Sequence, residues 1–191
     1  QVQGIIMAPA DRNRDYSDLI DSYRVSVVFV DRKTEMGNYD AVLTEHRRAA
    51  YDATMALLKQ GHQKIGFLGS TTKIYSNDER IEGYKKALQE ANLEVQDSLI
   101  KKGHGSNDGQ RMMSELIKEN RPTAVFVANS SLVIGVYHAL RKIDIETTGQ
   151  LQIISFDDNP WAEVMSPPLT TIRQPIEEIS RVAVGTLERR M

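Results

Sequence analysis

The sequence predicts an α/β fold in which parallel sheets carry helices on both faces. The clearest indication is the stretch from residue 49 to residue 69, where apolar side chains first recur at three- and four-residue spacing, as on one face of a helix. Gly61 follows the last of them, at a position where a left-handed helix end favours glycine. The next apolar run, residues 65–68, is typical of a strand covered on both faces. The rest of the chain repeats this order of helix and strand, which indicates βαβ units.

Two apolar runs near the start of the chain predict strands. Residues 4–7 form a short apolar run that Pro9 closes, and residues 25–30 form a β-branched run that ends at Asp31. We expect both to be strands buried on both faces, because parallel sheets are covered on both sides. Around them we expect a weak helix at residues 15–23, a polar loop at 32–39 and an extended segment at 40–45.

The later elements follow from apolar stripes at helical spacing and from short apolar runs that Gly or Pro closes. After a polar loop at residues 70–77, we expect helices at residues 78–92, across residues 112–117, up to residue 140 and from residue 176 to the end. The strands between them are expected at residues 99–100, 124–128, 151–156 and 169–172. Asn107 or Asp108 can cap the second of these helices, and Ser130 or Ser131 the third.

The composition is that of an ordinary globular protein. The chain has 191 residues, of which 40% are hydrophobic and 26% charged, enough for one large domain or two small ones. No apolar run approaches the roughly 18 residues that span a membrane, and the first residues do not form a signal peptide. Cysteine is absent, which excludes disulfides and thiolate metal sites. The net charge of −2 predicts that these residues do not themselves bind nucleic acid.

Polar residues follow the predicted strands at the point where each one ends. They are Asp31, Gly69-Ser70, His104, Asn129 and Asp157-Asp158. The carboxyl ends of parallel strands share one edge of a sheet, and ligands bind in the crevice outside that edge. Asp and Asn there suit the hydroxyl groups of a small polar molecule. The alternative is that they only cap the helices that follow, so the sequence indicates a polar crevice and not a catalytic site.

Motifs for catalysis are absent. The sequence has no nucleophile elbow, no phosphate-binding or dinucleotide-binding glycine loop and no zinc-protease motif. The four histidines do not have the spacing of metal ligands. Asp157 and Asp158 are adjacent, so we expect them to point apart rather than to act as a pair. Trp161 follows them, and its indole could stack on a sugar ring or anchor the loop. We therefore expect neither an enzyme, a metal site nor a cofactor.

Four segments, in order, resemble signatures of the LacI/GalR family of transcriptional regulators. They are LLKQGHQKIGFLGS, ERIEGYKKAL, PTAVFVANSSLVIG and LQIISFDDNPWAEVMSPPLTTIRQP. Together they are highly specific, and VVFVDR matches the strand and Asp that open the family's effector loop. Weaker similarities connect nearly all the rest of the chain.

The resemblance implies two similar Rossmann-like lobes with parallel sheets, of the periplasmic-binding-protein-like type I. Three crossing strands would join the lobes, and a small effector would bind between them. Residues 46–174 would form the C-terminal lobe, and residues 1–45 and 175–191 part of the N-terminal lobe. We expect this first lobe to be incomplete, because the family's helix-turn-helix, hinge helix, first two βα units and C-terminal extension have no counterpart in the sequence.

The resemblance also implies effector-binding residues. Arg80 lies where the family's arginine reaches effector hydroxyls or a carboxylate, and Asn129 matches the Asn of the family's Asn-Asp pair. Asp157 matches the first Asp of the strand-Asp-Asp motif, and Asp31 matches the Asp of the first lobe that faces the cleft. Trp161 is the fifth candidate.

Three departures from the family leave the identity of the effector open. Ser130 replaces the Asp of the Asn-Asp pair, and Glu45-His46 replaces the usual Asp-Asn at the first crossover. The aromatic residue that often stacks on the ligand is absent from Gly103-His104-Gly105. The segment from Gly69 to Arg80 cannot be aligned, so its side chains are given no role.

The predicted function is that of the effector-binding and dimerisation core of a LacI/GalR-type regulator, a repressor in the cytoplasm. A sugar-like or nucleoside-like effector would control binding to operator DNA by a helix-turn-helix that this sequence does not contain. The protein would form a homodimer and would not bind a membrane. One alternative is a periplasmic sugar-binding protein of an uptake system, which shares the fold. The other is an α/β enzyme, for which the sequence offers no nucleophile or cofactor motif.

Overall fold

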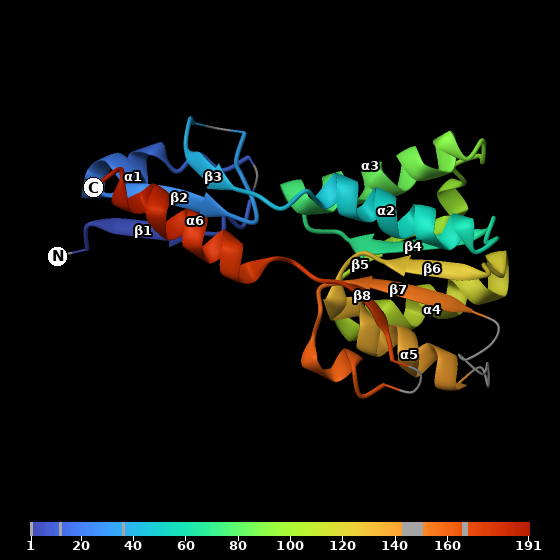
Figure 1. Ribbon diagram of the computed structural model, residues 1–191. Helices are drawn as coiled ribbons and strands as arrows, with labels where there is room; N and C mark the ends of the chain where they lie inside the picture. Colours follow the sequence, from blue (N-terminus) through green and yellow to red (C-terminus); the bar gives the residue numbers. More distant parts are fainter. Residues whose placement is uncertain (1, 12, 36, 143–150, 166–167) are drawn as a thin grey trace. The chain divides into compact units, whose positions relative to one another are not determined.

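The computed structural model describes residues 2–11, 13–35, 37–142, 151–165 and 168–191 (Figure 1). They form two compact units, each of which is described by itself. The first unit consists of Gln1–Glu45, Lys73–Asp78 and Gln174–Met191, and the second of His46–Thr72 and Glu79–Arg173. This division puts residues 73–78 and Gln174 in the first unit, whereas the boundaries expected from the sequence put them in the second.

The first unit has a three-stranded parallel sheet. Its strands are β1 (Gly4–Met7), β2 (Ser26–Val30) and β3 (Asp40–Val42), in the order β1-β2-β3. Helix α1 (Ser17–Tyr23) follows β1, and helix α6 (Ile176–Glu188) packs against all three strands. Val28 and Phe29 of the central strand are buried.

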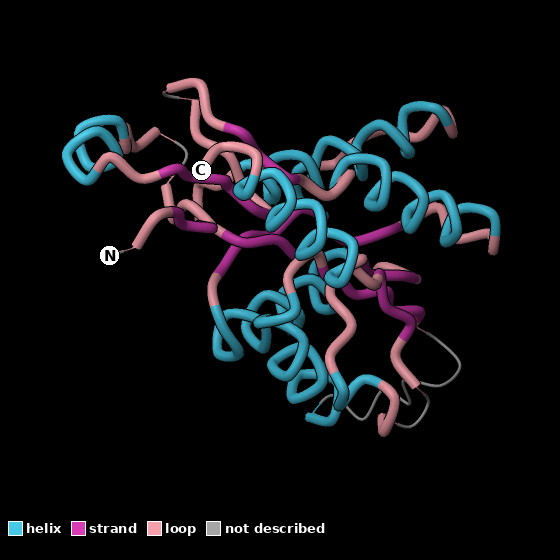
Figure 2. The backbone as a smooth tube through the Cα atoms, turned by 60° about the vertical axis from the view of Figure 1, so that its left-hand side comes forward, coloured by secondary structure: helices cyan, strands magenta, loops and turns pink. Residues whose placement is uncertain are grey.

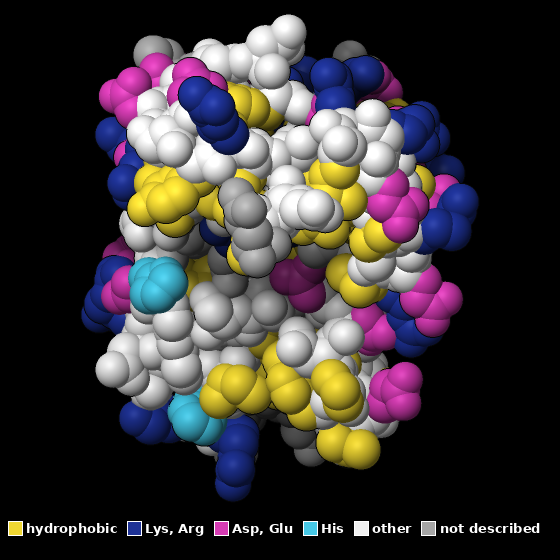
Figure 3. Space-filling model, turned by 90° about the vertical axis from the view of Figure 1, so that its left-hand side faces the viewer, with side chains coloured by type: hydrophobic (Ala, Val, Ile, Leu, Met, Phe, Trp, Pro, Cys, Tyr) yellow, Lys and Arg dark blue, Asp and Glu magenta, His cyan; other side chains and the backbone are white. Residues whose placement is uncertain are grey.

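The expectation that β1 is buried on both faces is wrong. Ile5 is 40% exposed and Ile6 is 41% exposed. Strand β1 is at an edge of the sheet, and an apolar cavity of about 480 Å³ separates it and β2 from α1. The cavity is lined by Val2, Ile5, Met7, Leu19, Ile20, Tyr23, Val25 and Val27. Hydrophobic side chains lie in several groups on the face drawn in Figure 3.

The second unit has a five-stranded parallel sheet in the order β5-β4-β6-β7-β8. The strands are β4 (Ile65–Ser70), β5 (Ile100–Gly103), β6 (Ala124–Val127), β7 (Gln152–Phe156) and β8 (Thr170–Ile172). Its helices are α2 (His46–Lys59), α3 (Tyr75–Glu90, which begins in the first unit), α4 (Gly105–Asn120) and α5 (Val133–Lys142). Helices α2 and α3 cover one face of the sheet, and α4 and α5 cover the other (Figures 1 and 2).

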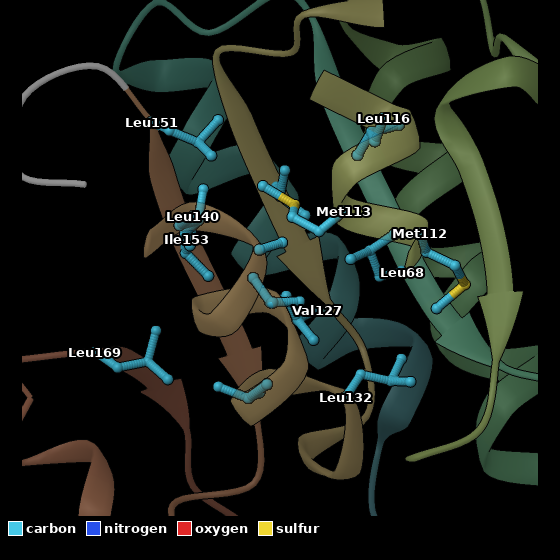
Figure 4. Packing of buried hydrophobic residues seen from close by; sticks show 14 of the residues in the cluster. Leu68, Met112, Met113, Leu116, Val127, Leu132, Leu140, Leu151, Ile153 and Leu169 are labelled. Atoms are coloured by element: carbon cyan, nitrogen blue, oxygen red, sulfur yellow. The ribbon is translucent and has the colours of Figure 1, made fainter. Parts of the chain in front are cut away.

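Alternate side chains of each central strand enter two separate cores. In β6, Ala124 and Phe126 pack with α2 and α3, whereas Val125 and Val127 pack with α4 and α5. Figure 4 shows the second of these cores, in which Leu68 and Val127 of the sheet meet Met112 and Met113 of α4. Because successive strand side chains point to opposite faces, a strand covered on both sides must be apolar throughout. This is the physical origin of the unbroken apolar runs in the sequence.

Three local expectations need correction. Helix α3 begins at Tyr75, inside the segment expected to be a loop. Asp108 does not cap α4 from its N-terminal end, because the helix begins at Gly105 and the Asp108 carboxylate accepts from the N–H of His104 instead. Asn129, rather than either serine, caps the turn before α5. Pro167, in the expected Pro-Pro break, lies outside the described residues.

Candidate functional site

Close packing of α2 and α3 places Arg80 at the carboxyl edge of the second sheet. Gly83 lies one turn after Arg80, and a Cβ at this position would overlap the carbonyl oxygen of Arg47 and come within 2.9 Å of the Tyr51 nitrogen. Glycine therefore lets the two helix backbones approach more closely than any other residue would. The sequence pattern Arg-x-x-Gly thus has a structural reason, since the glycine brings the arginine toward the N-terminal end of α2.

The guanidinium of Arg80 is held in a fixed position within the unit. The side chain is buried, with 5% of its surface exposed. Its Nη1 donates to the carbonyl oxygen of Ala128, at 2.7 Å, and its Cζ lies 3.6 Å from the centre of the Phe156 ring. A cation over an aromatic face is stabilised by the ring's quadrupole, and a buried charge needs such partners.

His46 is a further buried polar residue of this group. It is the first residue of α2 and is 1% exposed. Its Nδ1 lies 3.5 Å from Nη2 of Arg80, and its ring packs against Phe156 with the ring centres 5.6 Å apart. The Phe156 ring therefore contacts both the arginine and the histidine.

Ala128, Asn129 and Ser130 follow β6, and the first of them contacts Arg80 and the last contacts Asp157. The Oδ1 atom of Asn129 accepts from the N–H of Ser131, at 3.0 Å, so the capping role considered from the sequence is present. Within the described residues, the amide nitrogen of Asn129 has no hydrogen-bond partner. The Ser130 hydroxyl donates to Oδ2 of Asp157, at 3.4 Å. Ser130 thus occupies, with a hydroxyl, the position where the resemblance expected a carboxylate.

Asp157 directly follows β7 and has an unusual backbone conformation. Its φ angle is +70°, in the left-handed region that residues other than glycine rarely adopt, and its N–H donates to the carbonyl oxygen of Ile172. The neighbouring Asp158 has different partners, as expected for adjacent residues: the Thr171 hydroxyl, at 2.8 Å, and Nε of Arg173, at 2.6 Å. The Thr171 hydroxyl and then Arg173 hold the pKa of Asp158 below its ordinary value. The two carboxylates therefore do not form an acid–base pair.

Asp31 directly follows β2 of the first unit and also has a positive φ angle. Its φ angle is +61°, and its N–H donates to the carbonyl oxygen of Val42. Nε of Arg32 lies 3.3 Å from its Oδ2. A strained backbone at a non-glycine residue is a common feature of functional sites.

Trp161 differs from the other candidates because packing accounts for its side chain. It is partly buried against the core formed by α4, α5 and the sheet. This contact is the loop anchor that the sequence allowed as the alternative, and stacking on a sugar remains a prediction.

The structure brings Arg80, Asn129 and Asp157 together in the second unit. Arg80 binds the carbonyl of Ala128, the residue before Asn129, and the residue after it, Ser130, donates to Asp157, so the three groups lie around the carboxyl ends of β6 and β7. A guanidinium, an amide and a carboxylate are suited to the hydroxyl groups of a small polar molecule. The described residues contain no group of three or more His, Asp or Glu side chains that could hold a metal ion. Nor do they include a helix long and apolar enough to cross a membrane.

Sequence reasoning gave no role to His46 or Phe156 in this group. His46 was noted only as a departure from the family pattern, and Phe156 only as the last residue of a strand. Their contacts with Arg80 depend on the distance between α2, α3 and β7. Their positions in the sequence could have indicated a role. Phe156 directly precedes Asp157 at the end of β7, and His46 lies at the expected first crossover between the lobes.

The chain is similar to known regulators along its whole length. Residues 54–191 match the model of the periplasmic binding protein-like domain. The chain is 33% identical to the ribose operon repressor of Haemophilus influenzae and 30% identical to catabolite control protein A of Priestia megaterium. Both similarities cover 100% of the chain, which spans 58% of the length of each relative.

A solved structure has the same fold. It is a LacI family transcriptional regulator from Enterococcus faecium with bound ribose, which superposes with a TM-score of 0.88 at 28% identity. The superposition covers 98% of the chain and 71% of that structure. Parallel sheets in an α/β fold, expected from the sequence, are therefore confirmed.

Proposed function

The chain belongs to the family of periplasmic binding protein-like domains, among the LacI-type transcriptional regulators, and on this premise we propose that it is the effector-binding core of a repressor. The observation that carries the proposal is the buried Arg80, fixed beside Asn129 and Asp157 at the carboxyl edge of the second sheet. In this proposal the three side chains contact the effector, and Asp31 contributes from the first unit. Trp161 is the weakest of the candidates, because its packing already explains it.

The proposed effector is a small molecule rich in hydroxyl groups, such as a pentose. Arg80 supplies only donors, the Asp157 carboxylate supplies acceptors, and the Asn129 amide supplies N–H donors, so neighbouring sugar hydroxyls can both donate and accept. The similarity to a ribose operon repressor and to a regulator with bound ribose makes D-ribose the first molecule to test.

Control of DNA binding would follow from linkage. An effector that binds one arrangement of the protein more tightly shifts the population toward it, and the shift cannot exceed the difference in affinity. We propose that the protein acts in the cytoplasm as a homodimer and reaches operator DNA through a helix-turn-helix domain, as LacI-type repressors do. The similarity to repressors favours this function over a sugar-binding protein of an uptake system and over an enzyme.

Calorimetric titration of the chain with D-ribose, D-xylose and D-glucose tests the proposal. We expect one sugar to bind and Arg80→Lys to lower its affinity at least about tenfold, because an ammonium cannot reproduce the guanidinium fork. Arg111→Lys is the matched control. Arg111 is exposed on α4, where it pairs with Asp108 and Glu115, so its substitution should leave affinity unchanged. Equal affinities of wild type and Arg80→Lys would contradict the role of Arg80.

A further inference from the structure

We propose that His46 is a positioning residue for Arg80, and that it acts as a neutral imidazole with its proton on Nε2. This inference rests on the proposed function, because it concerns the same site. The resemblance gives His46 no role and only notes that it differs from the residue usual in the family. In this proposal His46 contacts Arg80 and not the effector.

The contact between Arg80 and His46 restricts the protonation of the imidazole. A guanidinium carries five N–H donors and no acceptor. The group that faces Nη2 at 3.5 Å is Nδ1 of His46, and it can stabilise the guanidinium only by offering a lone pair. The proton of a neutral imidazole must then be on Nε2. A protonated His46 would instead put a second cation beside Arg80, in a site where both side chains are almost completely buried.

Contacts from three different segments hold the guanidinium, among them the Ala128 carbonyl at Nη1, His46 at Nη2 and the Phe156 ring under Cζ. The ring contact sets the plane of the group, and the two contacts at its ends set the rotation within that plane. A guanidinium held in this way needs less ordering when an effector binds.

The backbone fixes the position of His46 itself. His46 is the first residue of α2, and Gly83 allows α3 to pack against the first turns of that helix. The imidazole also packs on Phe156, which belongs to a different element, β7. Helices α2 and α3 and strand β7 thus all determine where the Arg80 guanidinium lies.

The first experiment needs no ligand. Nitrogen NMR of the chain labelled in histidine identifies the tautomer of His46 at neutral pH, with His46→Asn used to assign its signals. We expect a neutral ring with a proton on Nε2 and none on Nδ1. A proton on Nδ1, in either the neutral or the charged ring, would overturn the proposal, because that nitrogen could not then accept from Arg80.

The second experiment measures affinity for D-ribose. His46→Ala should weaken binding about tenfold, the effect of losing one hydrogen bond to a charged group. His46→Asn should restore affinity to within about threefold, because an amide oxygen can accept from the arginine. Thr54→Val, which removes a buried hydroxyl from the same helix, is the control for general destabilisation and should leave affinity unchanged. Equal losses in the Ala and Asn variants, or none in either, would overturn the positioning role.

A double-mutant cycle separates this inference from the proposed function. Once His46 is Ala, Arg80→Lys should cost less affinity than it does in the wild type, because the fork is already loose. If D-ribose does not bind the wild type, the pentose assignment fails, and the same cycle is measured on the urea unfolding midpoint. Additive effects there would reject the contact between His46 and Arg80, whereas coupled effects would support it without a ligand.

Discussion

The two units of the chain use the same connection at the end of a central strand but cover their sheets differently. In the first unit, Asp31 follows β2 and its N–H donates to Val42, the last residue of β3. In the second, Asp157 follows β7 and its N–H donates to Ile172, the last residue of β8. Both aspartates have positive φ angles, and the strands pair in the same register. The chain therefore contains one structural device twice.

Burial is where the units differ. All six residues of β4 are buried, whereas β1 exposes about two fifths of Ile5 and Ile6. Helices cover both faces of the second sheet, but a cavity remains between α1 and the first sheet. The comparison shows that an apolar run determines that a strand forms, whereas its stability depends on what covers it.

The largest expected effect is a difference in hydrogen exchange between the two sheets. Amides of residues 65–68 should exchange only when the second unit unfolds. Amides of residues 27–30 should exchange at least about a thousandfold faster, a difference of roughly 4 kcal/mol in opening free energy, because their sheet is covered less completely. Exchange measured by mass spectrometry on the monomeric chain checks this. Equal protection of the two segments would mean that the cavity does not weaken the first unit.

The strands were predicted well from the sequence because each one is marked by its own run of apolar or β-branched residues. The β-branched run of β2 and the apolar runs of β4, β6 and β7 need no knowledge of their neighbours. The burial of Ile5 was predicted wrongly because it depends on the distance of α1, a tertiary property.

The candidate site was predictable in part for the same reason. Asn129 and Asp157 follow strands, and such positions meet at one edge of a parallel sheet. Arg80 came from the resemblance alone. The contacts of His46 and Phe156 with Arg80 could not be predicted, because they require the close approach of α2 and α3 that Gly83 permits.

The next effect compares the same substitution in a helix of each unit. Gly83→Ala should destabilise the second unit by about 2–3 kcal/mol, since the new methyl group meets the backbone of α2. Gly185→Ala in α6 should stabilise the first unit by about 0.5–1 kcal/mol, because the nearest atom is the side-chain end of Arg189, at 3.8 Å, and alanine favours a helix. Urea unfolding with exchange at β4 and β2 measures both changes. The same sign at both sites would contradict the helix packing described for one of them.

A smaller effect tests whether the two aspartates are equivalent. Asp31→Ala and Asp157→Ala should each cost their unit about 1 kcal/mol relative to the Asn variants, because asparagine tolerates a left-handed backbone and alanine does not. Exchange of the Asp31 and Asp157 amides, or of their replacements, reports the strength of each connection. A cost at one position only would show that the common geometry does not have a common energetic role.

The smallest effect concerns acid, and it compares the charged pair of each unit. Arg190 holds the pKa of Asp40 below its ordinary value in the first unit, and Thr171 followed by Arg173 does so for Asp158 in the second. A pKa lowered by folding means that the folded state binds the proton less readily than the unfolded state. The stabilisation is therefore complete above the unfolded pKa of about 4 and is lost as the pH falls through the folded value.

Between pH 5 and pH 2, both units should lose stability, and Asp40→Asn and Asp158→Asn should each lose less than the wild type. Urea unfolding at several pH values measures these slopes, and both should be small because the groups are exposed to solvent.

The effect of salt on these slopes distinguishes the charged pair of the first unit from that of the second. The neutral Thr171 hydroxyl supplies part of the lowering of the pKa of Asp158, whereas only arginines lower the pKa of Asp40, so 0.5 M NaCl should flatten the slope due to Asp40 more than that due to Asp158. Once Thr171 is Val, the pH dependence of stability that remains in the second unit should become as sensitive to salt as that of the first unit. If salt acts equally on both units before that substitution, the hydroxyl contributes little to the lowered pKa of Asp158, and the two charged pairs are alike.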